Sequence, residues 1–130
     1  MGRQTDEHRF AVLFRDDNPH AKERVGVYEE ALAFTVLIDE LVEKSEARFH
    51  LKDLLDKSAT AVAMRIAQAG AELNKLDRRR QYRVARRAAT DCAAVLDILA
   101  RRATGSPALL GAAKRAIISL VAQLATLAAR

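Results

Sequence analysis

The sequence predicts an all-α protein, folded as an antiparallel up-down four-helix bundle. Half of its 130 residues are hydrophobic, and most of these are Ala and Leu. Apolar residues recur at steps of three and four over four long segments, which is the period of a helix with one buried face. Five Gly and two Pro leave few breaks, and no strand-like alternation competes with the helical pattern.

Residues 1–20 form a mixed-charge leader, and we expect the bundle at residues 21–130. The leader holds one apolar island, residues 10–14, and ends at Pro19, which disfavours helical geometry in the residue before it. The leader has no apolar signal core, and the chain has a lone cysteine, Cys92. We therefore expect a protein of the reducing cytoplasm.

The first two helices are expected at about residues 21–48 and 51–73. In the first, the apolar face is expected to comprise Val25, Tyr28, Leu32, Thr35, Ile38, Leu41 and Val42. Acidic residues occupy much of its remaining surface. In the second, the apolar stripe comprises Leu51, Leu54, Leu55, Ser58, Ala59, Val62, Ile66, Ala69 and Leu73.

The last two helices are expected at about residues 78–102 and 107–129. Asn74 suits the left-handed end of the preceding helix, and Asp77 suits the N-cap of the third. The tripeptide Gly105-Ser106-Pro107 is a stop-and-start signal, because Gly ends a helix, Ser caps the next one and Pro fits its first turn. The stripe of the third helix includes Tyr82, Ala85, Cys92, Val95, Leu96 and Leu99.

The last helix is apolar around more of its circumference than one buried stripe requires. Its charge-free run, residues 116–129, is too short to span a bilayer, so we expect no membrane contact. A helix of this kind is expected to bury a second face against another subunit of a homo-oligomer. The residues expected at that oligomer interface are Ile117, Ile118, Val121 and Leu124.

Charge is divided unevenly along the chain. Residues 1–64 hold 9 Lys/Arg and 13 Asp/Glu, whereas residues 65–130 hold 13 Lys/Arg and 4 Asp/Glu. One short run near the start of the third helix, where the helix dipole disfavours cations, concentrates the basic residues. The basic residues of this run are Lys75, Arg78, Arg79, Arg80, Arg83, Arg86 and Arg87.

Three interpretations of the basic run stay open: a surface that binds nucleic-acid phosphates, a contact for an acidic protein or a neighbouring subunit, and a solvated face. Arginine suits bidentate phosphate contacts. Base stacking needs several aromatic side chains, and the run holds only Tyr82, which lies on the core stripe. Any nucleic-acid binding is therefore expected to depend on the phosphate backbone and to be weakly sequence-specific.

No pattern of catalytic or metal-ligating residues is visible, and we expect no enzymatic activity, no cofactor and no metal. Di-iron bundles use pairs of Glu-x-x-His motifs, but none of His8, His20 and His50 has a Glu three residues before it. Glu46 and His50 form a single pair four residues apart. Cys92 lies within an apolar stripe and is expected to be a buried, inert thiol.

Two segments carry a resemblance to a known family: residues 55–69 read LDKSATAVAMRIAQA, and residues 82–97 read YRVARRAATDCAAVLD. They resemble the second and third helices of the four-helix-bundle family of 23S ribosomal RNA intervening-sequence proteins. Relatives of that family include the accessory variability determinant of diversity-generating retroelements. The chain departs from the family pattern at Ala63, where the family has Pro, at Arg65, where it has Asn, and at Gln68-Ala69, where it has Glu-Gly.

The resemblance implies the bundle fold and a ring-like homo-oligomer, often a pentamer. For the retroelement relatives it also implies a basic surface that engages nucleic acid and a reverse transcriptase. Our hypothesis from the sequence is a non-enzymatic basic accessory module that binds nucleic-acid phosphates, alongside a partner enzyme such as a reverse transcriptase. The alternative is a structural or adaptor homo-oligomer, whose basic and acidic surfaces serve self-assembly or an acidic protein partner.

Overall fold

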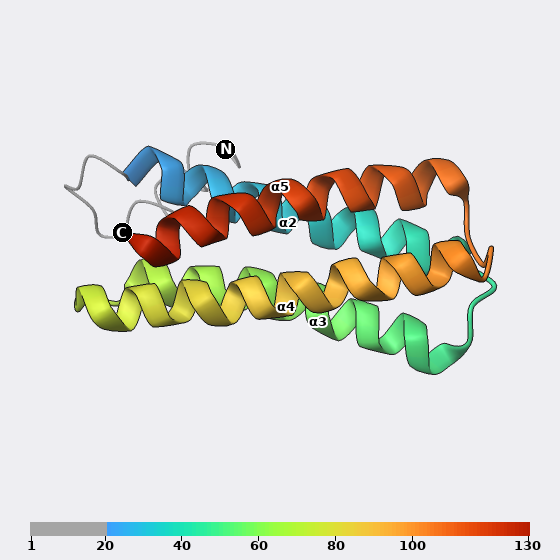
Figure 1. The fold of residues 1–130 in the computed structure, drawn as a ribbon, viewed down its shortest axis with the longest axis horizontal. Helices are drawn as coiled ribbons and strands as arrows, with labels where there is room; N and C mark the ends of the chain where they lie inside the picture. Colours follow the sequence, from blue (N-terminus) through green and yellow to red (C-terminus); the bar gives the residue numbers. More distant parts are fainter. Residues whose placement is uncertain (1–20) are drawn as a thin grey trace, which may run out of the picture.

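The computed structural model describes residues 21–130, which form four α-helices and, within that range, no strand. The helices are α2 (Ala21–Lys44), α3 (Phe49–Ala71), α4 (Lys75–Arg101) and α5 (Pro107–Ala129). Figure 1 shows α5 and α4 lying in front of α2 and α3. Each helix contacts its two neighbours, and neither α2 and α4 nor α3 and α5 are in contact. The predicted four-helix bundle is thus confirmed for this part of the chain, whereas the leader and its apolar island lie outside the described residues.

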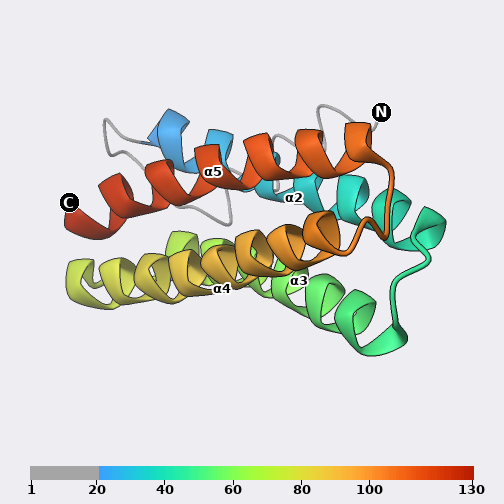
Figure 2. The ribbon, with the colours of Figure 1, turned by 45° about the vertical axis from the view of Figure 1, so that its right-hand side comes forward.

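Figure 2 shows that the α2/α3 loop and the α4/α5 loop lie at the same end of the bundle, where a hydrogen bond connects them. The hydroxyl of Ser45, between α2 and α3, donates a hydrogen bond to the carbonyl of Thr104, between α4 and α5. The Ser45 hydroxyl also accepts from the amide of Ala47 at 3.0 Å, so α2 ends at Lys44 rather than near residue 48. At the opposite end, Arg130 pairs with Glu23 in the first turn of α2.

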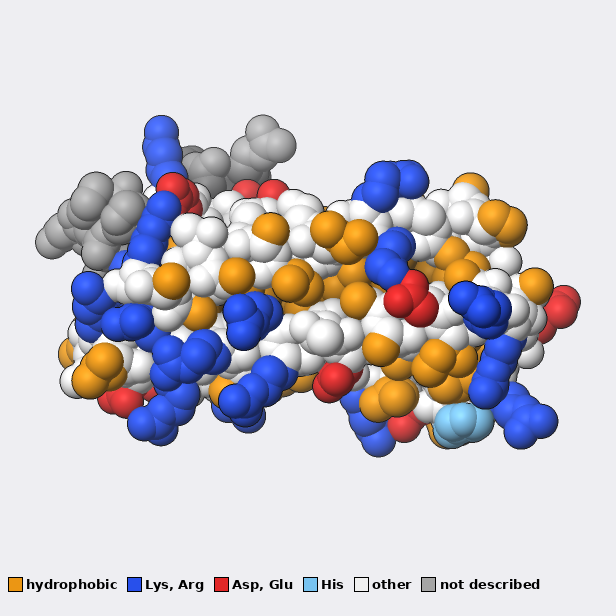
Figure 3. Space-filling model, viewed as in Figure 1, with side chains coloured by type: hydrophobic (Ala, Val, Ile, Leu, Met, Phe, Trp, Pro, Cys, Tyr) orange, Lys and Arg blue, Asp and Glu red, His pale blue; other side chains and the backbone are white. Residues whose placement is uncertain are grey.

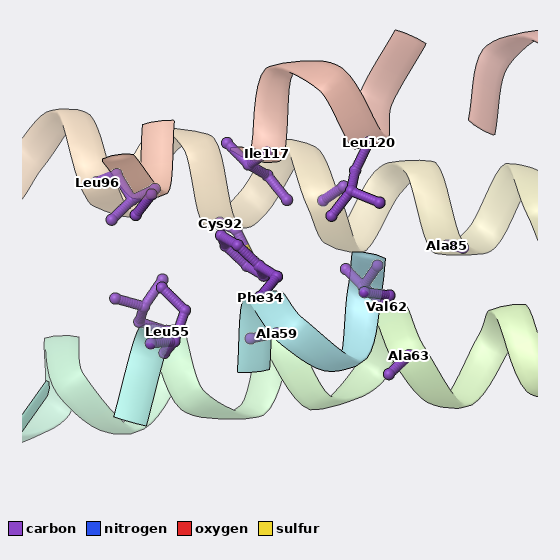
Figure 4. Close-up of a cluster of buried hydrophobic side chains, with 14 of the residues drawn as sticks. Phe34, Leu55, Ala59, Val62, Ala63, Ala85, Cys92, Leu96, Ile117 and Leu120 are labelled. Atoms are coloured by element: carbon purple, nitrogen blue, oxygen red, sulfur yellow. The ribbon is translucent and has the colours of Figure 1, made fainter. Parts of the chain in front are cut away.

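The core is built from one apolar stripe of each helix. Figure 4 shows Phe34 of α2, Leu55 of α3, Cys92 of α4 and Ile117 of α5 pointing into a common interior. The predicted stripe of α4 is confirmed, because its members are buried. The buried residues of α4 are Tyr82, Ala85, Ala89, Cys92, Val95, Leu96 and Leu99, and the main ones of α5 are Leu110, Ala113, Ile117, Leu120, Leu124 and Leu127.

The face of α2 that meets the core differs from the predicted one. Only Ile38 and Leu41 of the predicted stripe are fully buried, and Leu32 is 36% exposed. The core stripe instead consists of Val27, Ala31, Phe34, Ile38 and Leu41. The helix is apolar on two adjacent faces, and packing against α3 and α5 buries the face that carries Phe34. The stripe predicted for the second helix is confirmed in α3, except that Leu54 is exposed. Leu73 is also exposed and lies beyond the end of α3.

The C-terminal end of α4 is formed by an alanine rather than by the predicted glycine. Ala103 has a φ of 54°, the left-handed geometry that usually selects Gly, while Gly105 has no positive φ. The amide of Thr104 bonds the carbonyl of Leu99 at 3.1 Å, and the amide of Ala103 bonds that of Ala100 at 3.1 Å. These two bonds are those of a Schellman motif, which satisfies carbonyls at a helix end.

The last helix, α5, begins as predicted, with Ser106 as its N-cap and Pro107 in its first turn. Among the described helices it alone is long and apolar enough to cross a membrane, by length and composition only. Core helices of soluble bundles share these two properties, and one stripe of α5 is buried against its neighbours in the bundle.

Candidate nucleic-acid interface

The basic run lies entirely within α4, which begins three residues before its predicted start. Asn74 is the N-cap, because its side-chain oxygen accepts from the amides of Leu76 at 2.8 Å and Asp77 at 3.2 Å. The predicted cap, Asp77, lies within the first turn instead. Its carboxylate there offsets part of the repulsion between the helix dipole and the cations.

Two of the arginines are used to hold the bundle together. The Nε of Arg79 donates to the carbonyl of Ala128 at 3.0 Å, one of the last carbonyls of α5, which have no partner within their own helix. The Nη1 of Arg78 reaches the carbonyl of Glu72, just after α3, at 3.5 Å. Both contacts place a cation beside the negative end of a helix, which is electrostatically favourable.

The other five basic residues form an exposed surface at the N-terminal half of α4, where Figure 3 shows Lys and Arg side chains gathering. We call this surface the basic surface; it comprises Lys75, Arg80, Arg83, Arg86 and Arg87. Arg80 lies 3.8 Å from Asp77. The side chains of the other four make no hydrogen bond or ion pair with any described residue.

The positive charges of the basic surface lie close enough to repel one another. Arg83 is three residues from Arg80 and Arg86 and four from Arg87, so it neighbours all three on the helix surface. Like charges at this spacing destabilise a helix by about 0.2–0.5 kcal/mol per pair. Elsewhere on the described surface several lysines are paired with acids: Lys44 with Glu40 at 3.0 Å, Lys57 with Asp53 at 2.9 Å, and Lys114 with Asp97.

The four residues predicted for the oligomer interface do not share one surface. Ile117 and Leu124 are fully buried in the core of the bundle, so neither is available to a second subunit. Ile118 is 56% exposed, and Val121 is half-buried against the core. The predicted interface on α5 is therefore reduced to Ile118 and Val121. Sequence periodicity marks both kinds of position as apolar and does not separate them.

The described residues contain no cluster of three or more His, Cys, Asp and Glu residues that could hold a metal ion. Cys92 is fully buried, and burial, with a smaller contribution from the nearby Asp91 charge, raises the pKa of its thiol from 9.0 to about 12. The thiol is therefore protonated at neutral pH, the form that is a poor nucleophile. His50 is exposed at the start of α3, beyond the end of α2.

Neither protein-family models nor curated proteins match this chain. The resemblance to the intervening-sequence family thus rests on residues 55–69 and 82–97. In the structure, α3 continues without a break through Ala63, the position at which the family pattern has Pro. Arg65, at the position of the family's Asn, bonds Gln68 at 3.1 Å and Gln81 of α4 at 3.4 Å.

Proposed function

We propose that this protein is a non-enzymatic accessory module that binds nucleic-acid phosphates through the basic surface of α4, alongside a partner enzyme. The observation that carries the proposal is the absence of any partner among the described residues for Lys75, Arg83, Arg86 and Arg87. These cations repel one another on a helix that is otherwise well packed. A polyanion would remove that repulsion, and it would release its own condensed counterions on binding.

Binding of this kind has little sequence specificity. Sequence-specific recognition of single-stranded RNA stacks unpaired bases on aromatic side chains and reads their edges by hydrogen bonds. The one aromatic residue of the run, Tyr82, is 1% exposed and belongs to the core. The basic surface extends about 18 Å along α4, at 1.5 Å per residue, and offers arginine guanidinium groups suited to phosphate oxygens.

The alternative function is that of a structural or adaptor homo-oligomer. It is favoured by Ile118, which is 56% exposed in an apolar stretch of α5. In this case the basic surface contacts an acidic protein or a neighbouring subunit, and nucleic acid is not its ligand.

A salt titration with matched variants tests the proposal. The triple variant Arg83→Gln, Arg86→Gln, Arg87→Gln removes three unpaired charges and spares Arg79, which holds the end of α5. Binding to mixed-sequence RNA or DNA, measured by fluorescence anisotropy, should be largely lost at moderate salt. The slope of log affinity against log salt should flatten by about 2–3 units, since each phosphate contact contributes about 0.7–0.9. The melting temperature should hold or rise slightly, because like charges are removed.

The matched control is the triple variant Arg48→Gln, Arg101→Gln, Arg102→Gln. It removes the same charge from exposed positions outside the basic surface, at the other end of the bundle. This control should keep most of the affinity and of the salt slope. Wild-type protein that binds no nucleic acid at low salt would overturn the proposal. Equal losses in both triple variants would show that net charge alone is being measured.

A further inference from the structure

The seam between α2 and α3 is hollowed along its length by two adjoining depressions. Each has a volume of about 380 Å³, and Asp39 and Asp56 line both of them. All of the lining residues belong to α2 or α3, so the groove contains no residue of the basic surface on α4. We call it the α2/α3 groove. Sequence analysis did not find it, because it depends on which face of α2 turns toward the core.

One half of the groove holds most of its apolar side chains. These are Tyr28 and Leu32 of α2 and Ala63, Met64 and Ala67 of α3, which lie beside Thr35, Thr60 and the two shared carboxylates. Leu32 is 36% exposed and Met64 is 56% exposed. Methionine is common at surfaces that bind helices, because its flexible side chain adapts to the partner. Leu32, Met64 and Ala67 lie outside the buried core, whereas Ala63 belongs to it and Tyr28 packs against it.

The other half of the groove is acidic. Asp39, Glu43, Asp53 and Asp56 line it together with a single cation, Lys52. The ammonium of Lys52 donates to the carbonyl of Ser45 at 3.2 Å, and among these acids only Asp53 has an ion pair, with Lys57. Three carboxylates in the groove therefore have no cation partner among the described residues: Asp39, Glu43 and Asp56.

We propose that the α2/α3 groove binds a basic amphipathic helix of a partner protein. The three carboxylates without a cation partner favour a positively charged ligand, and the neighbouring apolar side chains favour a ligand that also has an apolar face. A seam between two helices accepts a third helix, whose apolar stripe enters the groove while its Lys or Arg side chains meet the rim.

The length of the groove matches about four turns of such a helix. From Tyr28 to Glu43, α2 rises about 22 Å at 1.5 Å per residue. A partner helix of about 15 residues covers that distance and places apolar residues three and four apart along the floor. This inference does not rest on nucleic-acid binding, because it uses none of the residues of the basic surface.

The test uses two fluorescent 18-residue peptides made of Leu and Lys. One has Leu at positions i, i+3, i+4 and i+7 and so forms an amphipathic helix; the other has the same composition in scrambled order. Wild-type protein should bind the amphipathic peptide at least tenfold more tightly than the scrambled one. Equal affinity for both peptides would overturn the proposal, because it would show only attraction of a polycation.

Two groove variants and two matched controls locate the binding. Neutralising the free carboxylates, with Asp39→Asn, Glu43→Gln and Asp56→Asn, should weaken binding about tenfold. The control Glu29→Gln, Glu46→Gln, Asp91→Asn removes the same charge elsewhere and should change affinity less than twofold.

The apolar half is tested in the same way. Leu32→Gln with Met64→Gln should weaken binding about tenfold, whereas Ile98→Gln with Leu76→Gln should not. The groove pair is 36% and 56% exposed and the control pair is 38% and 68% exposed. All of these positions are exposed, so the variants should keep the wild-type thermal melt. Similar losses in groove variants and controls would overturn the proposal.

Sedimentation of the same variants distinguishes a second copy of this chain from a partner protein. With a foreign helix as the occupant, the groove variants should sediment as the wild type does. An oligomer that dissociates only when the groove is altered would overturn the proposal, because the groove would then be filled by a neighbouring subunit.

Discussion

Arg79 and Arg83 are one helical turn apart on α4, yet their surroundings give them different roles. Arg79 is half-buried and bonds the carbonyl of Ala128 at 3.0 Å. Arg83 is exposed and has no partner among the described residues. Truncating Arg79 would therefore lower the stability of the bundle as well as any affinity for a ligand. Variants of Arg83, Arg86 and Arg87 would change the ligand affinity without removing a contact within the bundle.

At the same scale, Cys92 should make stability depend on alkaline pH. Its thiol titrates at about 12 in the folded protein and near 9.0 when unfolded. The unfolded state therefore loses the proton first, and the stabilising contribution is complete below pH 9 and is lost as pH rises toward 12. Replacing Cys92 by Ala should remove this dependence, which amounts to at most about 1.4 kcal/mol per pH unit.

Urea denaturation of the wild type and the Cys92→Ala variant at pH 7.5 and pH 10.5 measures the difference. The variant should be less stable than the wild type at pH 7.5 because it leaves a cavity, and this difference in unfolding free energy should shrink at pH 10.5. A thiol that reacts with iodoacetamide in the folded state as fast as in the unfolded state would contradict this account.

Local interactions determine where α4 begins and ends. At its start, Asn74 caps two amides and places the whole basic run on the helix. At its end, Ala103 occupies the left-handed position of a Schellman motif, with a φ of 54°. An L-residue with a Cβ is strained in this geometry by roughly 1–2 kcal/mol.

The replacement Ala103→Gly should therefore stabilise the protein by about 1 kcal/mol, because Gly adopts positive φ without steric cost. Denaturant melts measure the change in the unfolding free energy. The control Ala94→Gly, at an exposed position inside α4, should destabilise by a similar amount, since Gly is a poor residue within a helix. If Ala103→Gly is as destabilising as Ala94→Gly, the helix does not end in this motif in solution.

At the scale of the whole molecule, the proposed binding surfaces lie on different faces. The basic surface lies on α4, the groove lies between α2 and α3, and the exposed Ile118 lies on α5. Because α2 and α4 are diagonal, the acidic side chains of α2 do not reach the basic surface within one bundle. The arginines of one molecule are therefore available to a ligand or to another molecule.

Assembly through α5 is expected at this scale. If Ile118 and Val121 lie in a contact between subunits, Ile118→Glu should split the oligomer, because it buries an unpaired charge in an apolar contact. The monomer should stay folded, since Ile118 is 56% exposed within it. Light scattering at micromolar concentration measures the mass, and Val36→Glu, on an exposed apolar residue of α2, serves as the control. A monodisperse wild-type monomer would contradict the assembly.

The sequence by itself determined the elements and much of the core. Ser106 and Pro107 before an apolar run favour a helix start, because capping and a preset φ are local effects. The stripe of α4 was predictable for a related reason: this helix has one dominant apolar face, and the helical period alone identifies it. The basic run was visible for the same reason, as a cluster within a few turns.

Only the tertiary structure decided what depends on neighbours from distant parts of the chain. It selected the Phe34 face of α2 over the Leu32 face, placed Ile117 and Leu124 in the core, and left Ile118 outside it. It also turned Arg79 toward the end of α5 and left Arg83 exposed, without a partner among the described residues. Local periodicity cannot make these choices, because they are set by which surface of a helix meets another helix, and a groove such as that between α2 and α3 exists only once both are packed.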